Sequence, residues 1–307
     1  MPPRVMITSE LPIDPRSILG AYDEANRPAD ADAIVCLLRD RIDAALMDAA
    51  PRLRVIANVA VGYDNIDVGA ATARGICVAN TPDVLTEATA DLAFALALAA
   101  ARRLGEGERL VRSGGWRGWE LGQLLGQDVW GRVMGVIGLG RIGRAVARRA
   151  RGFGMDVLYT QPHEAPGEAG FVSFDELLAR ADVVSLHCPL TAETRNLIDA
   201  RALARMKPTA ILVNTARGAC VDEAALAAAL ERRQIFAAGL DVFADEPRVH
   251  PGLVASEHAV LAPHVGSATT TTRRRMAELA LGAARAVLDG ERPANLVNPD
   301  VWDRRRA

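Results

Sequence analysis

Short apolar runs with no polar alternation restrict the fold of this chain more than any other feature. In the first third they occupy residues 5–7, 33–38, 55–60 and 76–79. A strand that is apolar on both faces belongs in a parallel sheet whose two faces are covered by helices. A second series occupies residues 133–137, 156–159, 183–187, 210–214, 238–242 and 260–262. The chain is therefore predicted to be an α/β protein.

Helical segments separate these runs, and a length of 307 residues suggests about two domains. We expect two Rossmann-like or flavodoxin-like domains, each a doubly wound parallel sheet, with a cleft between them. Long helices are predicted over 86–103 and 269–288, and shorter ones over 142–153, 174–180 and 222–233. Residues 289–307 are too few for a third domain. The predicted domains are therefore 1–103 plus 289–307, which is discontinuous, and 104–288.

The segment 104–131 differs from its surroundings because glycines interrupt any periodic pattern and Trp116 and Trp119 stand among them. Glycine gains little from a regular helix or strand and loses much conformational entropy there. A loop or arm is predicted here rather than part of a sheet.

Composition argues against several classes of partner. The net charge of -2 offers no electrostatic attraction for nucleic acid or an anionic membrane. The cysteines form no C-x-x-C pair and most lie in apolar runs, which is typical of buried thiols in a reducing compartment. The start of the sequence has no apolar signal-peptide core, so we expect a cytoplasmic protein. No histidine or cysteine spacing predicts a metal site.

A glycine-rich loop follows the run at 133–137 and opens the helix predicted next. Its pattern is G-x-G-x-x-G, formed by Gly138, Gly140 and Gly143. The first glycine permits a tight turn, the second admits a pyrophosphate, and the third lets helix and strand approach. The helix N-terminus at Arg141 and Ile142 adds amide donors and the positive end of a dipole. Domain 104–288 is thus predicted to bind a dinucleotide, which leaves the substrate to the other domain.

The residues that distinguish the two nicotinamide dinucleotides are expected at the end of the next strand, at Thr160 and Gln161. No Asp or Glu stands there to bind the ribose hydroxyls, so nothing repels a 2′-phosphate. No arginine stands there to attract one either. NADP(H) is favoured and NAD(H) is possible.

Arg217, Glu246 and His264 each follow a predicted strand of the dinucleotide domain. Ligands of such sheets bind beyond the carboxyl ends of the strands, so the segments that carry these residues should converge. A guanidinium binds a carboxylate and an adjacent carbonyl through its planar fork. A histidine exchanges a proton with the carbonyl oxygen, and a carboxylate beside that histidine orients it. This set of groups predicts acid/base catalysis on a substrate that carries a carboxylate.

Together with the glycine loop, these segments resemble the D-isomer-specific 2-hydroxyacid dehydrogenase family, and the resemblance runs over about residues 55–298. Within that family, residues 59–67, 80–87 and 115–119 resemble the glyoxylate/hydroxypyruvate reductase branch. The resemblance implies reduction of glyoxylate to glycolate, of hydroxypyruvate to D-glycerate, or of both, with the catalytic roles given above. It also implies that the Val61 and Gly62 amides hold the substrate carboxylate.

Further residues are assigned by the same resemblance. Asp241 is expected near the nicotinamide ribose or carboxamide, and the cofactor is expected to be lined by Pro189, Thr215, Ala216 and Gly266. The glycine–tryptophan segment is expected to form the arm of a homodimer, with Trp119 reaching the neighbour's substrate. Two alternatives stay open, namely a D-2-hydroxyacid dehydrogenase for another 2-oxo acid and a non-catalytic dinucleotide sensor.

Overall fold

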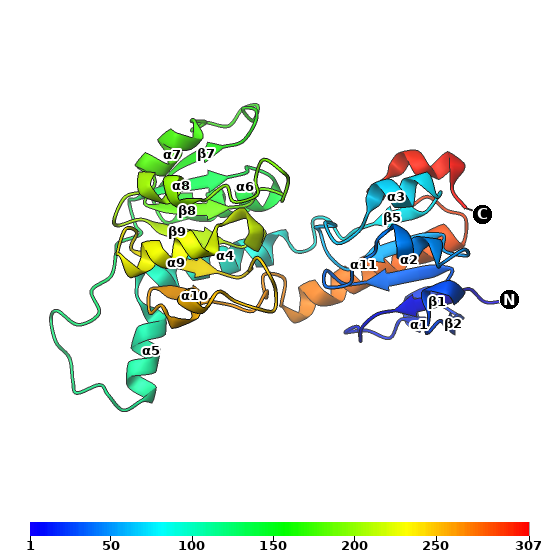
Figure 1. Cartoon of the computed structure of the whole chain (residues 1–307), viewed down its shortest axis with the longest axis horizontal. Helices are drawn as coiled ribbons and strands as arrows, with labels where there is room; N and C mark the ends of the chain where they lie inside the picture. Colours follow the sequence, from blue (N-terminus) through cyan, green and yellow to red (C-terminus); the bar gives the residue numbers. More distant parts are fainter. Residues whose placement is uncertain (307) are drawn as a thin grey trace. The chain divides into compact units, whose positions relative to one another are not determined.

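The computed structural model describes residues 1–306, which form two compact units (Figure 1). One unit comprises Met1–Leu85 with Ser267–Ala307, so both ends of the chain contribute to it. The other comprises Thr86–Gly266. Each unit has its own parallel sheet with helices on both faces, which confirms the predicted fold class.

The first unit is built on a five-stranded parallel sheet in the order β2-β1-β3-β4-β5. The strands are β1 (Arg4–Ile7), β2 (Asp23–Glu24), β3 (Ala33–Cys36), β4 (Val55–Asn58) and β5 (Cys77–Ala79). Its helices are α1 (Arg16–Leu19), α2 (Ala44–Asp48), α3 (Val68–Ala73) and α11 (Thr270–Leu288), with 3₁₀ turns η1 (Pro28–Asp30) and η3 (Pro299–Arg304). Every residue of β3 and β4 is buried, as strands covered on both faces require.

The second unit is built on a six-stranded parallel sheet in the order β11-β10-β9-β8-β6-β7. The strands are β6 (Val133–Ile137), β7 (Asp156–Thr160), β8 (Val183–Leu186), β9 (Ile211–Asn214), β10 (Ala237–Leu240) and β11 (Ala259–Leu261). Its helices are α4 (Thr86–Ala101), α5 (Leu104–Arg112), α6 (Arg141–Gly152), α7 (Phe174–Arg180), α8 (Ala200–Arg205), α9 (Glu223–Glu231) and α10 (Pro251–Ala255), with a 3₁₀ turn η2 (Gly218–Cys220). The chain reverses its direction across the sheet at β6, which is where such folds bind ligands.

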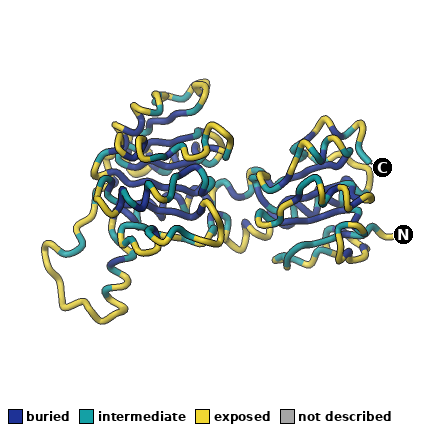
Figure 2. The backbone as a smooth tube through the Cα atoms, in the orientation of Figure 1, coloured by how far each residue is buried: buried dark blue, intermediate teal, exposed yellow. Residues whose placement is uncertain are grey.

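Alternate residues of the central strands feed two separate cores in this second unit. Val184 of β8 and Leu212 of β9 belong to one apolar cluster. Their neighbours Val183 and Val213 belong to the other. Figure 2 shows these buried strands enclosed by more exposed helices and loops. The two cores hold the strand ends that carry the candidate site in a fixed register.

The structure exchanges two long helices between the predicted domains. Helix α4, predicted in the domain 1–103 plus 289–307, belongs to the second unit, and helix α11, predicted in the domain 104–288, belongs to the first. Helix α4 packs on the sheet of the second unit, where a Cβ on Gly239 would lie only 2.8 Å from the Cβ of Leu96. Helix α11 places Ala280 and Leu281 in the core of the first unit with Val55. The bare backbone at Gly239 accounts for the close approach of α4 to β10.

Residues 104–131 contain a helix that the glycine pattern did not predict. Helix α5 covers Leu104–Arg112. It begins at a partly buried ion pair in which Arg103 Nη2 lies 2.6 Å from the carboxylate of Glu106. That pair offsets part of the low helix propensity of Gly105 and Gly107. Residues 113–131, all described, form neither helix nor strand, and Figures 1 and 2 show them extending as an exposed arm.

Across residues 1–306, no helix combines the length and the apolar character needed to cross a bilayer.

Candidate active site

Arg217, Glu246 and His264 follow β9, β10 and β11, which are neighbours in the second sheet. Parallel strands end at the same edge of a sheet, so the three following segments lie together. His264 Nδ1 lies 2.8 Å from Glu246 Oε2. The positive charge of Arg217 also acts on the Glu246 carboxylate. The structure thus brings the predicted catalytic residues together within one unit.

Both oxygens of the Glu246 carboxylate are engaged. Oε2 contacts the His264 ring, and Oε1 accepts the backbone N–H of Phe243 at 3.0 Å. Burial by itself would raise the pKa of this carboxyl group, but the bonds from His264 and Phe243 and the charge of Arg217 outweigh it. The net pKa of Glu246 is lowered. The group therefore stays ionised near neutral pH and can compensate a positive charge on the imidazole.

The backbone of His264 adopts the left-handed conformation, with φ of 54°. Its N–H donates to the carbonyl oxygen of Asp241 at 2.8 Å. The Asp241 carboxylate accepts the next two N–H groups, from Val265 at 2.7 Å and from Gly266 at 2.8 Å. Three successive amides are thus tied to one residue, which fixes the direction of the imidazole.

Asp241 was expected near the nicotinamide ribose or carboxamide, and the structure shows that each of its carboxylate oxygens accepts a backbone N–H. The residue is buried, with 1% of its surface exposed. Burial raises the pKa of Asp241 despite these two N–H donors. The expected position near the nicotinamide ribose or carboxamide stays a prediction.

Arg217 is held by a residue that the sequence did not single out. The buried Asn214 ends β9, donates from Nδ2 to the carbonyl oxygen of Arg217 at 2.8 Å, and accepts the N–H of Ala216 at 3.0 Å. Arg217 Nη1 donates to the carbonyl oxygen of Ala216 at 2.7 Å. A polar amide at the end of an otherwise apolar strand was the available signal, because a buried amide must find partners there.

The glycine loop connects β6 to α6, as predicted. Gly138 has φ of 92°, and a Cβ there would lie 2.8 Å from the backbone nitrogen of Cys188. A Cβ on Gly143 would lie 2.2 Å from the carbonyl oxygen of Gly138. A Cβ on Gly140 would meet no described atom within 4 Å. The first and third glycines are therefore required by packing, and the second leaves an open approach to the N-terminus of α6.

This open approach fits a pyrophosphate, because the helix begins at Gly140 without a side-chain cap. Nearby, the buried hydroxyl of Thr215 has no hydrogen-bond partner among the described residues, as expected for a group that meets a ligand. Ala216 follows it, and Pro189 lies just beyond β8. The residues present thus fit a dinucleotide.

At the end of β7, Thr160 is buried and Gln161 is tied to the glycine loop. Gln161 Oε1 accepts the N–H of Leu139 at 3.1 Å, and Nε2 donates to the carbonyl oxygen of His163 at 2.8 Å. Both side chains are uncharged. The end of this strand therefore carries neither the acid typical of NAD sites nor an arginine.

Val61 and Gly62 lie in the first unit, in the loop after β4. The side chains of Asn80 and Asn58 donate to their carbonyl oxygens at 2.8 Å and 2.7 Å. The preceding carbonyl, of Ala60, accepts the N–H of Thr81 at 2.8 Å. In a trans peptide the N–H points away from the C=O, so these bonds also fix the directions of the Val61 and Gly62 amides.

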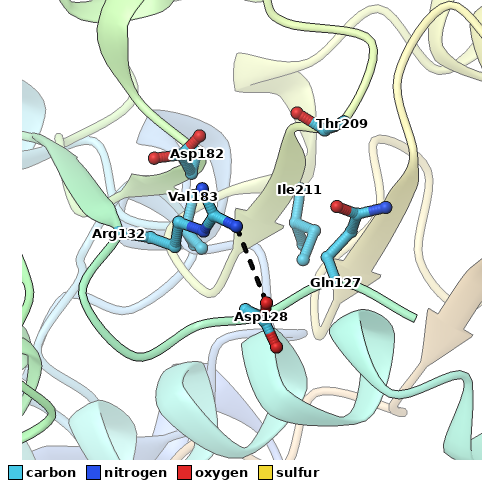
Figure 3. Close-up of a pocket in the computed structure, with 7 residues that line it drawn as sticks. All are labelled: Gln127, Asp128, Arg132, Asp182, Val183, Thr209 and Ile211. Carbon is cyan, nitrogen blue, oxygen red and sulfur yellow. Dashed lines mark ion pairs between the residues drawn. The ribbon is translucent and has the colours of Figure 1, made fainter.

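A small pocket of about 90 Å³ lies at the opposite edge of the second sheet (Figure 3). It is lined by the residues that begin β8 and β9, with Asp182 and Arg132 at its wall. The Asp182 carboxylate accepts a hydrogen bond from the N–H of Val133 at 2.9 Å and forms an ion pair with Lys207 at 2.8 Å. These bonds join strand starts, so the pocket is no part of the candidate active site. No group of three or more His, Cys, Asp or Glu residues in 1–306 could hold a metal ion.

The doubly wound sheet and its glycine loop are typical of a dinucleotide-binding domain. A family model described as D-isomer specific 2-hydroxyacid dehydrogenase, NAD binding domain, matches residues 94–266. A glyoxylate reductase of Thermococcus onnurineus is 47% identical over 330 aligned residues, covering 100% of this chain and 99% of that protein. The chain belongs to the D-isomer-specific 2-hydroxyacid dehydrogenase family, as the resemblance predicted, and is an oxidoreductase that uses a nicotinamide dinucleotide.

Solved structures agree with this assignment. A protein of Thermus thermophilus is 47% identical with a TM-score of 0.89, covering 96% of this chain and 99% of that one. An NADPH-dependent glyoxylate/hydroxypyruvate reductase of Sinorhizobium meliloti, in complex with NADP and malonate, is 34% identical with a TM-score of 0.89. The match covers 100% of this chain and 99% of the Sinorhizobium chain. The shared fold therefore extends over both units.

Proposed function

We propose that this chain reduces glyoxylate to glycolate, hydroxypyruvate to D-glycerate, or both, with a reduced nicotinamide dinucleotide. The observation that carries the proposal is the 2.8 Å contact between His264 and Glu246 beside Arg217. A proton donor with a charge-compensating carboxylate, next to a guanidinium, suits a substrate with a carboxylate and an adjacent carbonyl. Curated relatives over the full length carry the name glyoxylate reductase.

In the proposed mechanism, Arg217 binds the substrate carboxylate and carbonyl oxygen through its fork of donors. The glycine loop and the N-terminus of α6 would hold the reduced dinucleotide, which would be the source of the hydride for the carbonyl carbon. His264 donates a proton from Nε2 to the carbonyl oxygen, since Nδ1 faces Glu246. Glu246 keeps the ring oriented and balances its positive charge before the transfer. The Val61 and Gly62 amides, whose directions are fixed, are the predicted additional donors for the substrate carboxylate.

The proposed cofactor preference is NADP(H), with NAD(H) possible. The uncharged end of β7 supports it, because no carboxylate at Thr160 or Gln161 would repel a 2′-phosphate. The Sinorhizobium relative is described as NADPH-dependent and was solved with NADP. Arg141 and Ile142 at the start of α6 are proposed to face the pyrophosphate.

The proposed assembly is a homodimer in the cytoplasm, with the arm at residues 113–131 as the contact. Trp119 and Leu121 expose 79% and 81% of their surface on this arm. Exposed apolar side chains gathered on one segment favour burial against another protein surface. Trp119 is proposed to reach the partner's substrate.

The test is the absorbance of reduced nicotinamide with glyoxylate and hydroxypyruvate, each paired with NADH and with NADPH. Rapid oxidation in one or more pairings supports the proposal, and the ratio between cofactors tests the NADP(H) preference. If all pairings fail while dinucleotide still binds, bulkier 2-oxo acids are assayed next. Failure with these as well would favour the dinucleotide sensor.

A further inference from the structure

Helix α9 begins with two adjacent acids that have different partners. Asp222 caps the helix, since its Oδ1 accepts the N–H of Ala225 at 3.0 Å. Glu223 instead bonds outside the helix, where its Oε1 accepts the N–H of Ala244 at 2.7 Å. Ala244 lies in the loop that leads from β10 to Glu246. One acid thus serves the helix and the other serves the candidate active site.

The loop from Phe243 to Glu246 is fixed through two consecutive amides. The N–H of Phe243 donates to Glu246 Oε1 at 3.0 Å, and the N–H of Ala244 donates to Glu223. The first bond closes the loop on itself. The second ties the loop to the start of α9, and a carboxylate is a stronger acceptor for a backbone N–H than a neutral group.

The same peptide rests on the backbone of Gly218. A Cβ at Gly218 would lie 1.8 Å from the carbonyl carbon of Phe243 and 2.3 Å from the nitrogen of Ala244. Gly218 directly follows Arg217, and Glu223 is the first residue of α9, immediately after the connection that begins at β9. The 243–244 peptide is therefore positioned by contact with Gly218 and by the hydrogen bond to Glu223.

We propose that Glu223 is a positioning residue for the acid/base pair, which keeps the Glu246 carboxylate bonded to His264 by holding the Ala244 amide. The inference rests on the proposed roles of Glu246 and His264. Without Glu223, the N–H of Ala244 bonds to water. The exposed loop then becomes more mobile at Ala244, which lies two residues before Glu246. A small displacement of Glu246 costs turnover, because the proton donor must be aligned before hydride transfer.

The test compares Glu223→Ala with Glu223→Gln in the full-length enzyme. We expect kcat of Glu223→Ala to fall about tenfold to a hundredfold, with KM for the 2-oxo acid changed by less than about threefold. Glu223→Gln keeps an acceptor oxygen for Ala244 and should retain kcat within about threefold of wild type. The solvent deuterium isotope effect on kcat should rise in Glu223→Ala, since misalignment slows the proton transfer.

Asp222→Ala is the matched control, because it removes the helix cap next door without touching the loop. It should lower Tm and leave kcat and the isotope effect unchanged. Unchanged kcat in Glu223→Ala, or an equal loss of kcat in Asp222→Ala, would overturn the inference. His264→Asn separates failure of the proposed catalytic roles from failure of the proposed role of Glu223. If this variant stays active, the proposed catalytic roles fail. If it is inactive while Glu223→Ala is normal, only the role of Glu223 fails.

Discussion

The buried carboxylate of Asp241 holds the turn that places His264 in its left-handed conformation. The bonds run from Asp241 to the amides of Val265 and Gly266, while the His264 N–H reaches the Asp241 carbonyl. One buried residue thus supplies the hydrogen-bond partners for the backbone N–H groups around the proposed proton donor, where no helix or strand supplies them.

Asp241→Asn tests this relationship. Its amide offers one acceptor oxygen for two N–H groups, so one buried donor loses its partner, at a cost of about 1–3 kcal/mol. We expect a lower Tm and a lower kcat, measured by thermal unfolding and by steady-state kinetics. Asp182→Asn, whose carboxylate joins strand starts at the opposite edge, is the control. It should lower Tm with kcat unchanged, and equal kcat losses in both variants would contradict the interpretation.

Glu246→Gln removes the negative charge beside His264 and keeps the size of the side chain. The expected result is a fall in kcat of about tenfold to a thousandfold, because the imidazole loses its compensating charge. Cofactor binding, followed by nicotinamide fluorescence, should be unchanged. A variant with normal kcat would contradict the proposed role.

The lowered pKa of Glu246 also predicts a pH dependence. Because the folded-state pKa is below the ordinary value of 4.5, the pairing contributes its full stabilisation above about pH 4.5 and loses it as the pH falls further. The Tm difference between wild type and Glu246→Gln should therefore shrink as the pH falls below about pH 4.5. A difference that grows on acidification would contradict the assigned direction.

Arg217→Ala and His264→Asn should affect different kinetic constants. Loss of the guanidinium removes substrate binding, so KM should rise most. Loss of the imidazole removes the proton donor, so kcat should fall by about 10²–10⁴-fold with little change in KM. Asparagine is the suitable replacement, because it tolerates the φ of 54° at this position. Near-wild-type kinetics in either variant would reject the assignment.

The glycines of the phosphate loop offer a matched set. Gly140→Ala places a methyl group in open space, so Tm should stay within about 2 °C while NAD(P)H affinity falls at least about tenfold, since the Cβ blocks the approach of the pyrophosphate. Gly143→Ala should lower Tm itself, because its Cβ would collide with the Gly138 carbonyl. Gly152→Ala, also in open space at the end of α6, should change neither property. Titration of nicotinamide fluorescence and thermal unfolding check all three.

Trp119→Ser tests the proposed dimer arm. Wild type should scatter light as a dimer, and the variant, alone or with Leu121→Ser, should shift toward the monomer mass because apolar contact area is lost. Val254→Ser changes an exposed apolar residue on α10 and should leave the mass unchanged. A wild-type monomer at every concentration would refute the homodimer.

Features that depend on local pattern could be predicted from the sequence, whereas those that depend on which surfaces meet could not. Apolar runs locate the strands because burial on both faces leaves no polar alternation, and the glycine loop is recognised from its spacing after β6. The unit to which α4 belongs depends on the bare backbone of Gly239, distant in sequence. Helix α5 was missed because Gly105 and Gly107 lower its helix propensity, and the Arg103–Glu106 ion pair offsets part of that cost.

Within the candidate site, the same distinction applies. Arg217, Glu246 and His264 were predicted because each follows a strand of one sheet and each has a side chain suited to the chemistry. Asn214 and Glu223 were not, since both bind backbone groups of loops whose course is set by the fold. Residues that take part in the chemistry are easier to predict from a sequence than the residues that hold them in position.

The proposed proton donor, its carboxylate and the arginine proposed to bind the substrate all belong to the unit Thr86–Gly266, whereas the Val61 and Gly62 amides belong to the other. This division of labour separates two targets of natural selection. Substitutions around Val61 and Gly62 would change the proposed contacts to the substrate carboxylate and leave every residue of the proposed acid/base pair in place.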